Sequence, residues 1–452
     1  MTKSQNKAFL KIVGERILSE ANDLKRTPAA LAEDLKIDVE FVNAVIAGEA
    51  DIQDAQEFVR MMVNTYPITL KEVWIVEDDC TNGVKVMRAK ESVESSRIFE
   101  RLNRKGELTS YYEYRDTVMS RTAPFKPEWI SQLRIVNDDD PNNPDVIYNN
   151  GHLLHQATFF IGEVNFYWES EGKKHCACMN TGDSNYITPF VPHSFTSRNP
   201  KKPGLILAMT FAGSVQNALD DFCRIGPKAA DEMAGDPREK STFYRRLSRH
   251  LAAESVSLMW LSKKMENPGR LDEIINGDTP SINEINEIAL ILNIRAIDLM
   301  VTNFDANEEV GIRRHVDCQP RIYPIDAESP AYNMFELTRI PRQPYLKGFN
   351  VEVLVGTGGD LTHSLHEYIY NYGDVPIILF WNDGQKEVLS PGDSAYVSPN
   401  ISHRFELNDG DSKGYLILLR IPGNLTDSVI DEYSAFAMEG RGRICGETRR
   451  WF

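Results

Sequence analysis

The chain has few cysteines and no long apolar run. Its 452 residues include six cysteines, of which only Cys176 and Cys178 lie close together. No second Cys or His pair of suitable spacing accompanies them, so we expect reduced thiols on a hairpin turn rather than a zinc site. No run of apolar residues is long enough to cross a bilayer, and residues 1–7 lack the apolar stretch of a signal peptide. These absences predict a soluble, cytoplasmic protein with no membrane partner.

Positive charge is also scarce. The chain carries 50 Lys and Arg against 66 Asp and Glu, a formal net charge of -16, which disfavours broad contact with nucleic acid. Residues 31–56 show a helix-turn-helix pattern, yet Lys36 is their only basic residue. A recognition helix must present cationic and amide side chains among the phosphates. We therefore expect no nucleic-acid partner, and a structural or substrate-covering role for this segment.

The chain is long enough for several domains, and a repeat divides it. Residues 9–75 and 247–301 carry apolar positions at helical spacing, which predicts two small helix-turn-helix-like bundles. Residues 110–212 and 321–421 carry alternating and β-branched runs between Gly, Pro, Asn and Asp clusters, which predicts strands. The expected order along the chain is therefore helices, strands, helices, strands.

A spacing of metal-binding residue types occurs once in each strand-rich segment. In each, a His is followed by a second donor four residues on, and by another His about forty residues later on a Gly-Asp…Pro…His segment. The two sets are His152, Gln156 and His193, and His363, Glu367 and His403. This pattern is typical of metal-binding cupin (double-stranded β-helix) barrels. We predict an α+β fold with a first helical domain at residues 1–80, a first cupin at 81–230, a second helical domain at 231–305 and a second cupin at 306–452.

The two sets differ in ligand and surroundings. Two imidazoles and one oxygen donor suit iron(II), because they leave coordination positions open for oxygen chemistry. On ligand chemistry alone, the carboxylate of Glu367 is a better donor than the neutral amide of Gln156. The surroundings favour the first set, since Asn149 stands where the second copy has Asp360, which would repel an anionic substrate. His155 would point to the opposite strand face from Gln156 and support the barrel. The sequence leaves open whether the second set binds a metal.

Cationic and phenolic side chains precede the first set. Arg104, Tyr112 and Tyr114 are donors of the kind that bind a phosphate-like group. The corresponding stretch of the second copy, residues 331–335, has fewer such donors. An ordinary strand with exposed Tyr and Arg would explain the same residues without a ligand, so both interpretations stay open at this point.

Together these motifs resemble the 2-hydroxyethylphosphonate-processing non-haem iron oxygenases. This family contains methylphosphonate synthase, hydroxyethylphosphonate dioxygenase and, as a single-unit relative, hydroxypropylphosphonate epoxidase. The resemblance covers nearly the whole chain. It implies Fe(II) as the cofactor, held by His152, Gln156 and His193, with a small-molecule phosphonate and O2 as partners.

The resemblance also implies substrate-binding and catalytic roles. Lys25, which the helical domain would insert over the substrate, and Tyr112 are the implied catalytic residues. The second bundle has no Lys at the aligned place near Ser255. The sequence does not say whether Lys25 serves its own chain or a neighbouring subunit, and it leaves the oligomeric state open, a homo-oligomer included. The implied substrate-binding residues are Lys25, Arg104, Tyr112, Tyr114, Asn149 and His193.

The third ligand separates the branches of this family. The epoxidase has Glu at the position of Gln156, and the dioxygenase takes its Glu from the position of Ile187, whereas methylphosphonate synthase is similar to this chain in using Gln. The resemblance therefore implies C–C cleavage of 2-hydroxyethylphosphonate with O2 to methylphosphonate and bicarbonate. One alternative is the dioxygenase outcome, hydroxymethylphosphonate and formate. A more distant one is a non-catalytic helix-turn-helix–cupin regulator, which tight DNA binding at physiological salt would support.

Overall fold

A computed structural model describes most of the chain, in two compact units. The first unit comprises residues 1–85, 120–123 and 422–452, and the second comprises residues 86–119 and 124–421. The described residues are 3–234, 242–301, 309–325, 328–340, 346–354, 359–382, 384–408, 410–411 and 413–446. The expected domain boundary between residues 305 and 306 lies outside them. Within these ranges, no helix combines the length and the apolar character needed to cross a membrane.

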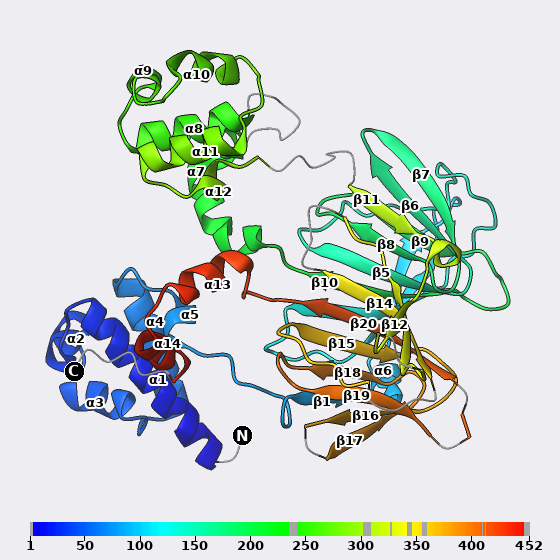
Figure 1. Ribbon diagram of the computed structural model, residues 1–452. Helices are drawn as coiled ribbons and strands as arrows, with labels where there is room; N and C mark the ends of the chain where they lie inside the picture. Colours follow the sequence, from blue (N-terminus) through cyan, green and yellow to red (C-terminus); the bar gives the residue numbers. More distant parts are fainter. Residues whose placement is uncertain are drawn as a thin grey trace. The chain divides into compact units, whose positions relative to one another are not determined.

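The first unit is helical (Figure 1). Thr27 caps the start of its second helix through its side chain, and Lys36 ends that helix in a left-handed conformation with φ of 58°. The apolar faces meet in a core in which Ile17, Leu31 and Phe58 are fully buried. The helices of this unit are α1 (Lys3–Asp23), α2 (Pro28–Leu35), α3 (Val39–Ile46), α4 (Ile52–Thr65), α5 (Leu70–Val73), α13 (Asp427–Ser434) and α14 (Met438–Cys445).

The second unit also contains a helical segment with its own core. Leu247, Leu261 and Ile288 are buried there, and Ser281 caps α11 by accepting from the backbone of Glu284. The expected boundary between residues 230 and 231 falls inside α7. The helices of this unit are α6 (Ala89–Glu94), η1 (Ser214–Ala218), α7 (Leu219–Ala234), α8 (Thr242–Ala253), α9 (Leu258–Ser262), α10 (Pro268–Ile275), α11 (Ile282–Leu292), α12 (Ala296–Leu299) and η2 (His315–Asp317).

The strands form two copies of one topology (Figure 1). One seven-stranded sheet has the order β11-β8-β5-β10-β4-β3-β2 and the other β1-β18-β15-β20-β14-β13-β12, while three-stranded sheets β7-β6-β9 and β17-β16-β19 accompany them. The strands of the first copy are β2 (Arg97–Leu102), β3 (Leu108–Asp116), β4 (Phe125–Gln132), β5 (His155–Ile161), β6 (Val164–Ser170), β7 (Lys173–Met179), β8 (Ser184–Ile187), β9 (His193–Ser197) and β10 (Leu205–Phe211). Those of the second are β12 (Arg321–Tyr323), β13 (Tyr332–Glu336), β14 (Lys347–Leu354), β15 (His366–Asn371), β16 (Ile377–Trp381), β17 (Gln385–Leu389), β18 (Ser394–Val397), β19 (His403–Leu407) and β20 (Lys413–Ile421).

Each seven-stranded sheet includes one edge strand from the other half of the chain. Strand β11 (Val310–Arg313) precedes the second set of strands, yet it pairs antiparallel with β8 of the first (Figure 1). In the same way, β1 (Val84–Met87) precedes the first set and lies next to β18 of the second. The two halves therefore exchange strands, and neither large sheet is complete without the other half.

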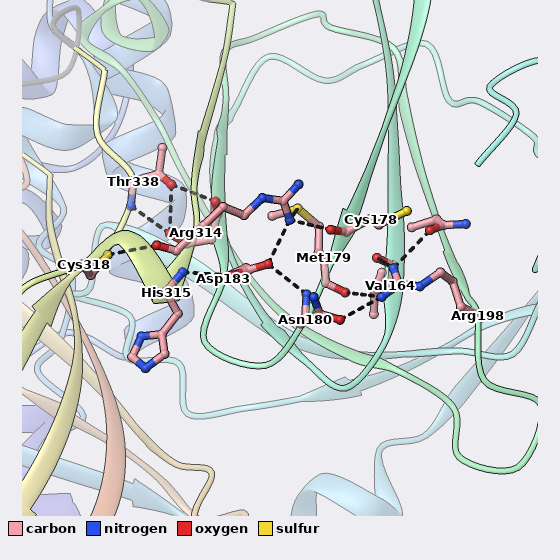
Figure 2. Close-up of polar contacts among 12 residues, drawn as sticks. Val164, Cys178, Met179, Asn180, Asp183, Arg198, Arg314, His315, Cys318 and Thr338 are labelled. Atoms are coloured by element: carbon pink, nitrogen blue, oxygen red, sulfur yellow. Dashed lines mark hydrogen bonds and ion pairs between the residues drawn. The ribbon is translucent and has the colours of Figure 1, made fainter. Parts of the chain in front are cut away.

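The aspartate of each Gly-Asp motif fixes this exchange. Asp183 accepts from Nη1 of Arg314 at 2.9 Å and from the backbone N–H of His315 at 2.9 Å (Figure 2). Asp393 accepts from Nη1 of Arg88 at 3.0 Å and from the next backbone N–H at 2.7 Å. Both carboxylates are nearly buried, so each needs the cation that the exchanged segment brings.

His155 and its counterpart His366 face away from the ligand sets, as expected for His155. The Nδ1 atom of His155 lies 2.8 Å from the hydroxyl of Tyr186, and its ring stacks on Phe211. In the second copy, Nδ1 of His366 lies 2.6 Å from the hydroxyl of Tyr396. Burial lowers the pKa of each of these histidines to about 4, so both are neutral at physiological pH.

We predict that Asp183→Ala lowers the free energy of unfolding by about 2 kcal/mol, because it removes the buried acceptor of the Arg314 guanidinium and of the backbone N–H groups of Asn180 and His315. The midpoint of a urea transition followed by circular dichroism measures this change. Glu57→Ala removes the exposed pair with Arg60 and is expected to change the free energy of unfolding by less than about 0.5 kcal/mol. Equal midpoints for the two variants would contradict a role for Asp183 in holding β11.

We also predict that the metal-free protein loses stability as the pH falls from about 6.5 toward 4. The folded pKa of His155 and His366 lies below the unfolded value of about 6.5, so the unfolded chain takes up protons first. The loss should be on the order of 2 kcal/mol for each histidine, discounted for partial exposure. Urea midpoints measured across this range should fall less steeply in His155→Gln, and an unchanged slope would contradict the prediction.

Candidate metal centre

Two imidazoles and one amide of the first set converge. His152 lies in the segment before β5, Gln156 lies on β5 and His193 opens β9. Nε2 of His152 is 3.2 Å from Oε1 of Gln156, and the two imidazole rings stand edge to face with centroids 5.3 Å apart. The large and the small sheet of the first copy each contribute a ligand candidate, which brings together residues 41 positions apart in sequence.

Backbone carbonyls fix which nitrogen of each imidazole faces the centre. Nδ1 of His152 lies 2.8 Å from the carbonyl oxygen of Leu154, and Nδ1 of His193 lies 2.8 Å from that of Val191. These contacts place the proton on Nδ1 and leave the Nε2 lone pair for a metal. Gln156 is oriented in a comparable way, because its Nε2 donates to Oγ1 of Thr158 at 2.9 Å and its carbonyl oxygen therefore faces His152.

The charge state of the centre suits a cation. Burial lowers the pKa of His193 to about 4, and neighbouring His152 adds to the shift, so this imidazole is neutral at pH 7 as a metal ligand must be. The Nδ2 atom of Asn149 lies 3.0 Å from Nε2 of His193, and its Oδ1 accepts from the backbone N–H of His193 at 2.9 Å. Asn149 is thus fixed with its donor toward the centre.

The structure brings the predicted tyrosines close to the strand that carries His193. The hydroxyl of Tyr112 accepts from the backbone N–H of Phe195 at 3.0 Å and lies 3.2 Å from Oγ of Ser194. The ring of Tyr114 packs edge-on against that of Tyr112. In the second copy, Tyr332 accepts in the same way from the backbone of Phe405 at 2.9 Å. The hydroxyl of Tyr112 therefore also has a structural task, which is to tie β3 to β9.

The role of Arg104 at the substrate stays a prediction, because the structure shows this residue paired with Asp145. It lies in the turn between β2 and β3, half exposed, with its Nε 2.5 Å from Oδ2 of Asp145. Arg101 lies on β2, and its positive charge acts on the hydroxyl of Tyr114. Burial raises the pKa of Tyr114 to about 12, and the positive charge of Arg101 opposes this rise. The sequence Asn-Arg-Lys-Gly at 103–106 is a readable turn signal that would have placed Arg104 at a hairpin tip.

Sequence reasoning also missed two charged residues on neighbouring strands. Glu128 lies on β4, and burial raises its pKa while the charges of Arg97 and His152 oppose the rise. Nη2 of Arg97 lies 2.7 Å from Oδ1 of Asp116 and 4.0 Å from Oε1 of Glu128. The proline at position 127 obscured the strand pattern that would have put Glu128 on an inward face.

Lys25 follows α1 in a left-handed conformation with φ of 58°. Its Nζ donates to the carbonyl oxygens of Asn22 at 3.3 Å and Asp23 at 3.2 Å, near the end of that helix. Ser255 has the same conformation after α8, with φ of 56°. Lys25 belongs to the first unit and the ligand candidates to the second, so its role over a substrate stays a prediction.

The second set also converges, but with an extra cation. Nε2 of His363 lies 3.0 Å from Oε2 of Glu367, and Nε2 of His403 lies 2.8 Å from Oε1. Arg420 forms an ion pair with the same carboxylate. Burial opposes ionisation of Glu367, but Arg420 and His403 hold its pKa well below the ordinary value. The two sets are therefore alike in position and different in charge.

Comparisons with known proteins place the chain among phosphonate-processing enzymes, although no protein-family model matches it. It is 36% identical to methylphosphonate synthase of Nitrosopumilus maritimus over an alignment of 464 positions. The alignment covers 97% of this chain and 95% of the relative. The chain is also 29% identical to (S)-2-hydroxypropylphosphonic acid epoxidase of Streptomyces wedmorensis over 103 residues. This match covers 22% of this chain and 49% of the epoxidase.

Solved structures agree with this relationship. HEPD of Streptomyces albus, with 2-hydroxyethylphosphonate and Fe(II) bound, superimposes with a TM-score of 0.88 at 33% identity, over 98% of this chain and 99% of that one. PhpD with cadmium has the same fold, with a TM-score of 0.73 at 16% identity over 97% and 99% of the two chains. Because the similarity to the archaeal synthase extends over nearly its whole length, the chain belongs to the methylphosphonate synthase family.

Proposed function

We propose that the protein is a non-haem iron(II) oxygenase that cleaves the C–C bond of 2-hydroxyethylphosphonate with O2, giving methylphosphonate and bicarbonate. The observation that carries this proposal is the first ligand set, in which Oε1 of Gln156 lies 3.2 Å from Nε2 of His152. The chain that holds this set is 36% identical to methylphosphonate synthase. The bound Fe(II) and 2-hydroxyethylphosphonate in the similar structure of HEPD support the same metal and substrate.

The residues of the first set fit iron(II). His152 and His193 offer imidazole nitrogens, and Gln156 offers a neutral oxygen, a mixed set that suits this ion better than structural zinc. The carbonyls of Leu154 and Val191 hold the two imidazoles in orientation. A bound iron(II) ion would supply the reaction with O2 and the one-electron steps that side chains cannot perform.

The chain's own task is to bind and orient an anionic substrate. Arg101 supplies positive charge, and Tyr114, whose pKa of about 12 keeps it protonated at pH 7, supplies a hydrogen-bond donor. Asn149 presents its Nδ2 next to His193, where it would donate to a phosphonate oxygen. Tyr112 and Lys25 are proposed to complete the binding of substrate, whereas Arg104 pairs with Asp145 in the exposed turn between β2 and β3.

Aromatic packing would keep water from the reacting carbon. Phe195 is buried, its ring stacks on that of Phe166 at 5.2 Å between centroids, and it stands edge-on to His193 at 5.8 Å. Such a wall lowers the local dielectric and protects a reactive species from side reactions.

The architecture that we propose is a helix-turn-helix-like bundle followed by a cupin barrel, repeated in tandem. The matched strand orders of the two halves support the cupin repeat. The matched turns support the helical repeat, because Lys25 and Ser255 share a left-handed conformation and Thr27 and Ser257 cap the next helix in the same way.

The dioxygenase outcome is the second candidate function. HEPD of Streptomyces albus is 33% identical to this chain over almost its whole length, so both outcomes would use one site and differ in the fate of the cleaved fragment. Phosphorus NMR of the product separates them. We expect a methylphosphonate signal after the iron-loaded protein meets 2-hydroxyethylphosphonate and O2. A hydroxymethylphosphonate signal would move the protein to the dioxygenase branch, and unchanged substrate would contradict both.

We predict that His193→Ala abolishes iron binding and activity, because it removes one of two imidazole ligands. Iron content after anaerobic loading and desalting, together with product formation, measures the effect. His363→Ala removes an imidazole of the second set, the counterpart of His152, and is expected to keep both iron and activity. The ligand assignment fails if His193→Ala keeps its iron and His363→Ala loses it.

We predict that Arg101→Gln raises the KM for 2-hydroxyethylphosphonate by about 10- to 100-fold, the range expected when a charge-assisted hydrogen bond is lost. Arg104→Gln, which breaks an exposed pair, is expected to change KM by less than about threefold. Steady-state oxygen consumption measures both. The reverse ranking would restore Arg104 as the phosphonate anchor.

A further inference from the structure

The second ligand set differs from the first by one full charge. Glu367 is completely buried, and so is His403 except for 1% of its surface. In the first set the corresponding donor, Gln156, is a neutral amide that needs no counter-charge. A buried carboxylate is stable only next to a cation. In the second set, therefore, either a metal ion or another positive group must stand beside Glu367.

Arg420 is that group. It lies directly opposite Glu367 in the pairing of β15 with β20, its Nε donates to Oε2 of Glu367, and only 12% of its side chain is exposed. Its guanidinium carbon lies 5.5 Å from the ring centroid of Phe349, which holds its position from another strand. In the first half, the residue opposite Gln156 is Thr210, which has no charge.

Both oxygens of Glu367 are already engaged. Oε1 faces His403 at 2.8 Å, while Oε2 faces His363 at 3.0 Å and also accepts from Arg420. A metal ion bound by this set would share a carboxylate with a guanidinium that cannot lose its charge. The repulsion between a dication and this fixed cation disfavours metal binding.

We propose that the second set is a metal site closed by Arg420, whose positive charge takes the place of the ion. In the wild-type protein the second set would then be a metal-free ion cluster that holds β15, β19 and β20 together. Its three ligand atoms are close enough together to hold a divalent ion, since they lie within 4.8 Å of one another. Removal of Arg420 alone would therefore open a second site for a first-row divalent ion.

Cobalt(II) loading tests this proposal, with Arg420→Thr as the variant that copies Thr210 of the first half. Full-length proteins are equilibrated with Co(II) without oxygen, desalted and analysed for metal. We expect about one ion per chain in the wild type and about two in Arg420→Thr. Arg420→Lys keeps the cation and should stay near one. Circular dichroism and the urea midpoint show whether each variant is folded.

Further variants assign each ion to its set. Adding His403→Ala to Arg420→Thr should remove the second ion and leave the first, whereas adding His193→Ala should remove the first and leave the second. The proposal is overturned if the wild type binds two ions and loses one with His403→Ala. It is also overturned if folded Arg420→Thr gains none. Wild type that binds no ion, together with one ion in Arg420→Thr, would support the closed site and count against the proposed iron site instead.

Discussion

Compensation of buried charge is the constraint on which the organisation of this protein depends. Asp183 and Asp393 are each matched by an arginine from the exchanged segment, and Glu367 is matched by Arg420. Gln156, which stands where the second set has Glu367, is a neutral amide and needs no counter-charge. A buried group that needs no counter-charge leaves its surroundings available for an ion that arrives from solution. The first half can thus stay ready for a metal while the second half is internally neutralised.

Neutrality at the first centre is reinforced by the backbone. The carbonyl oxygens of Leu154 and Val191 select the protonated nitrogen of each imidazole, and burial keeps His193 uncharged. His193 then has no proton to lose when an ion binds at pH 7. In the proposed function, Arg101 and Tyr114 would complement the negative charge of a phosphonate, since the ligand set itself carries no negative charge.

Much of this arrangement was readable from the sequence. The spacing of His152, Gln156 and His193, which His363, Glu367 and His403 repeat, predicted that each set converges. Arg104 and Arg420 show where sequence reading stops. Arg104 was expected at the substrate from the family resemblance, and its place at a hairpin tip leaves that role a prediction. The contact of Arg420 with Glu367 depends on strand register over 53 residues, which no local pattern encodes.

The exchanged edge strands have a consequence for how such a chain could have arisen or be divided. Without β11, strand β8 would expose a row of unpaired backbone groups, and without β1 the same would hold for β18. Open edges of this kind pair readily with other chains, so either half in isolation would tend to aggregate or to form a strand-swapped dimer. A symmetric dimer of single halves has the same two exchanges, which makes it a natural ancestor of the fused, tandem form.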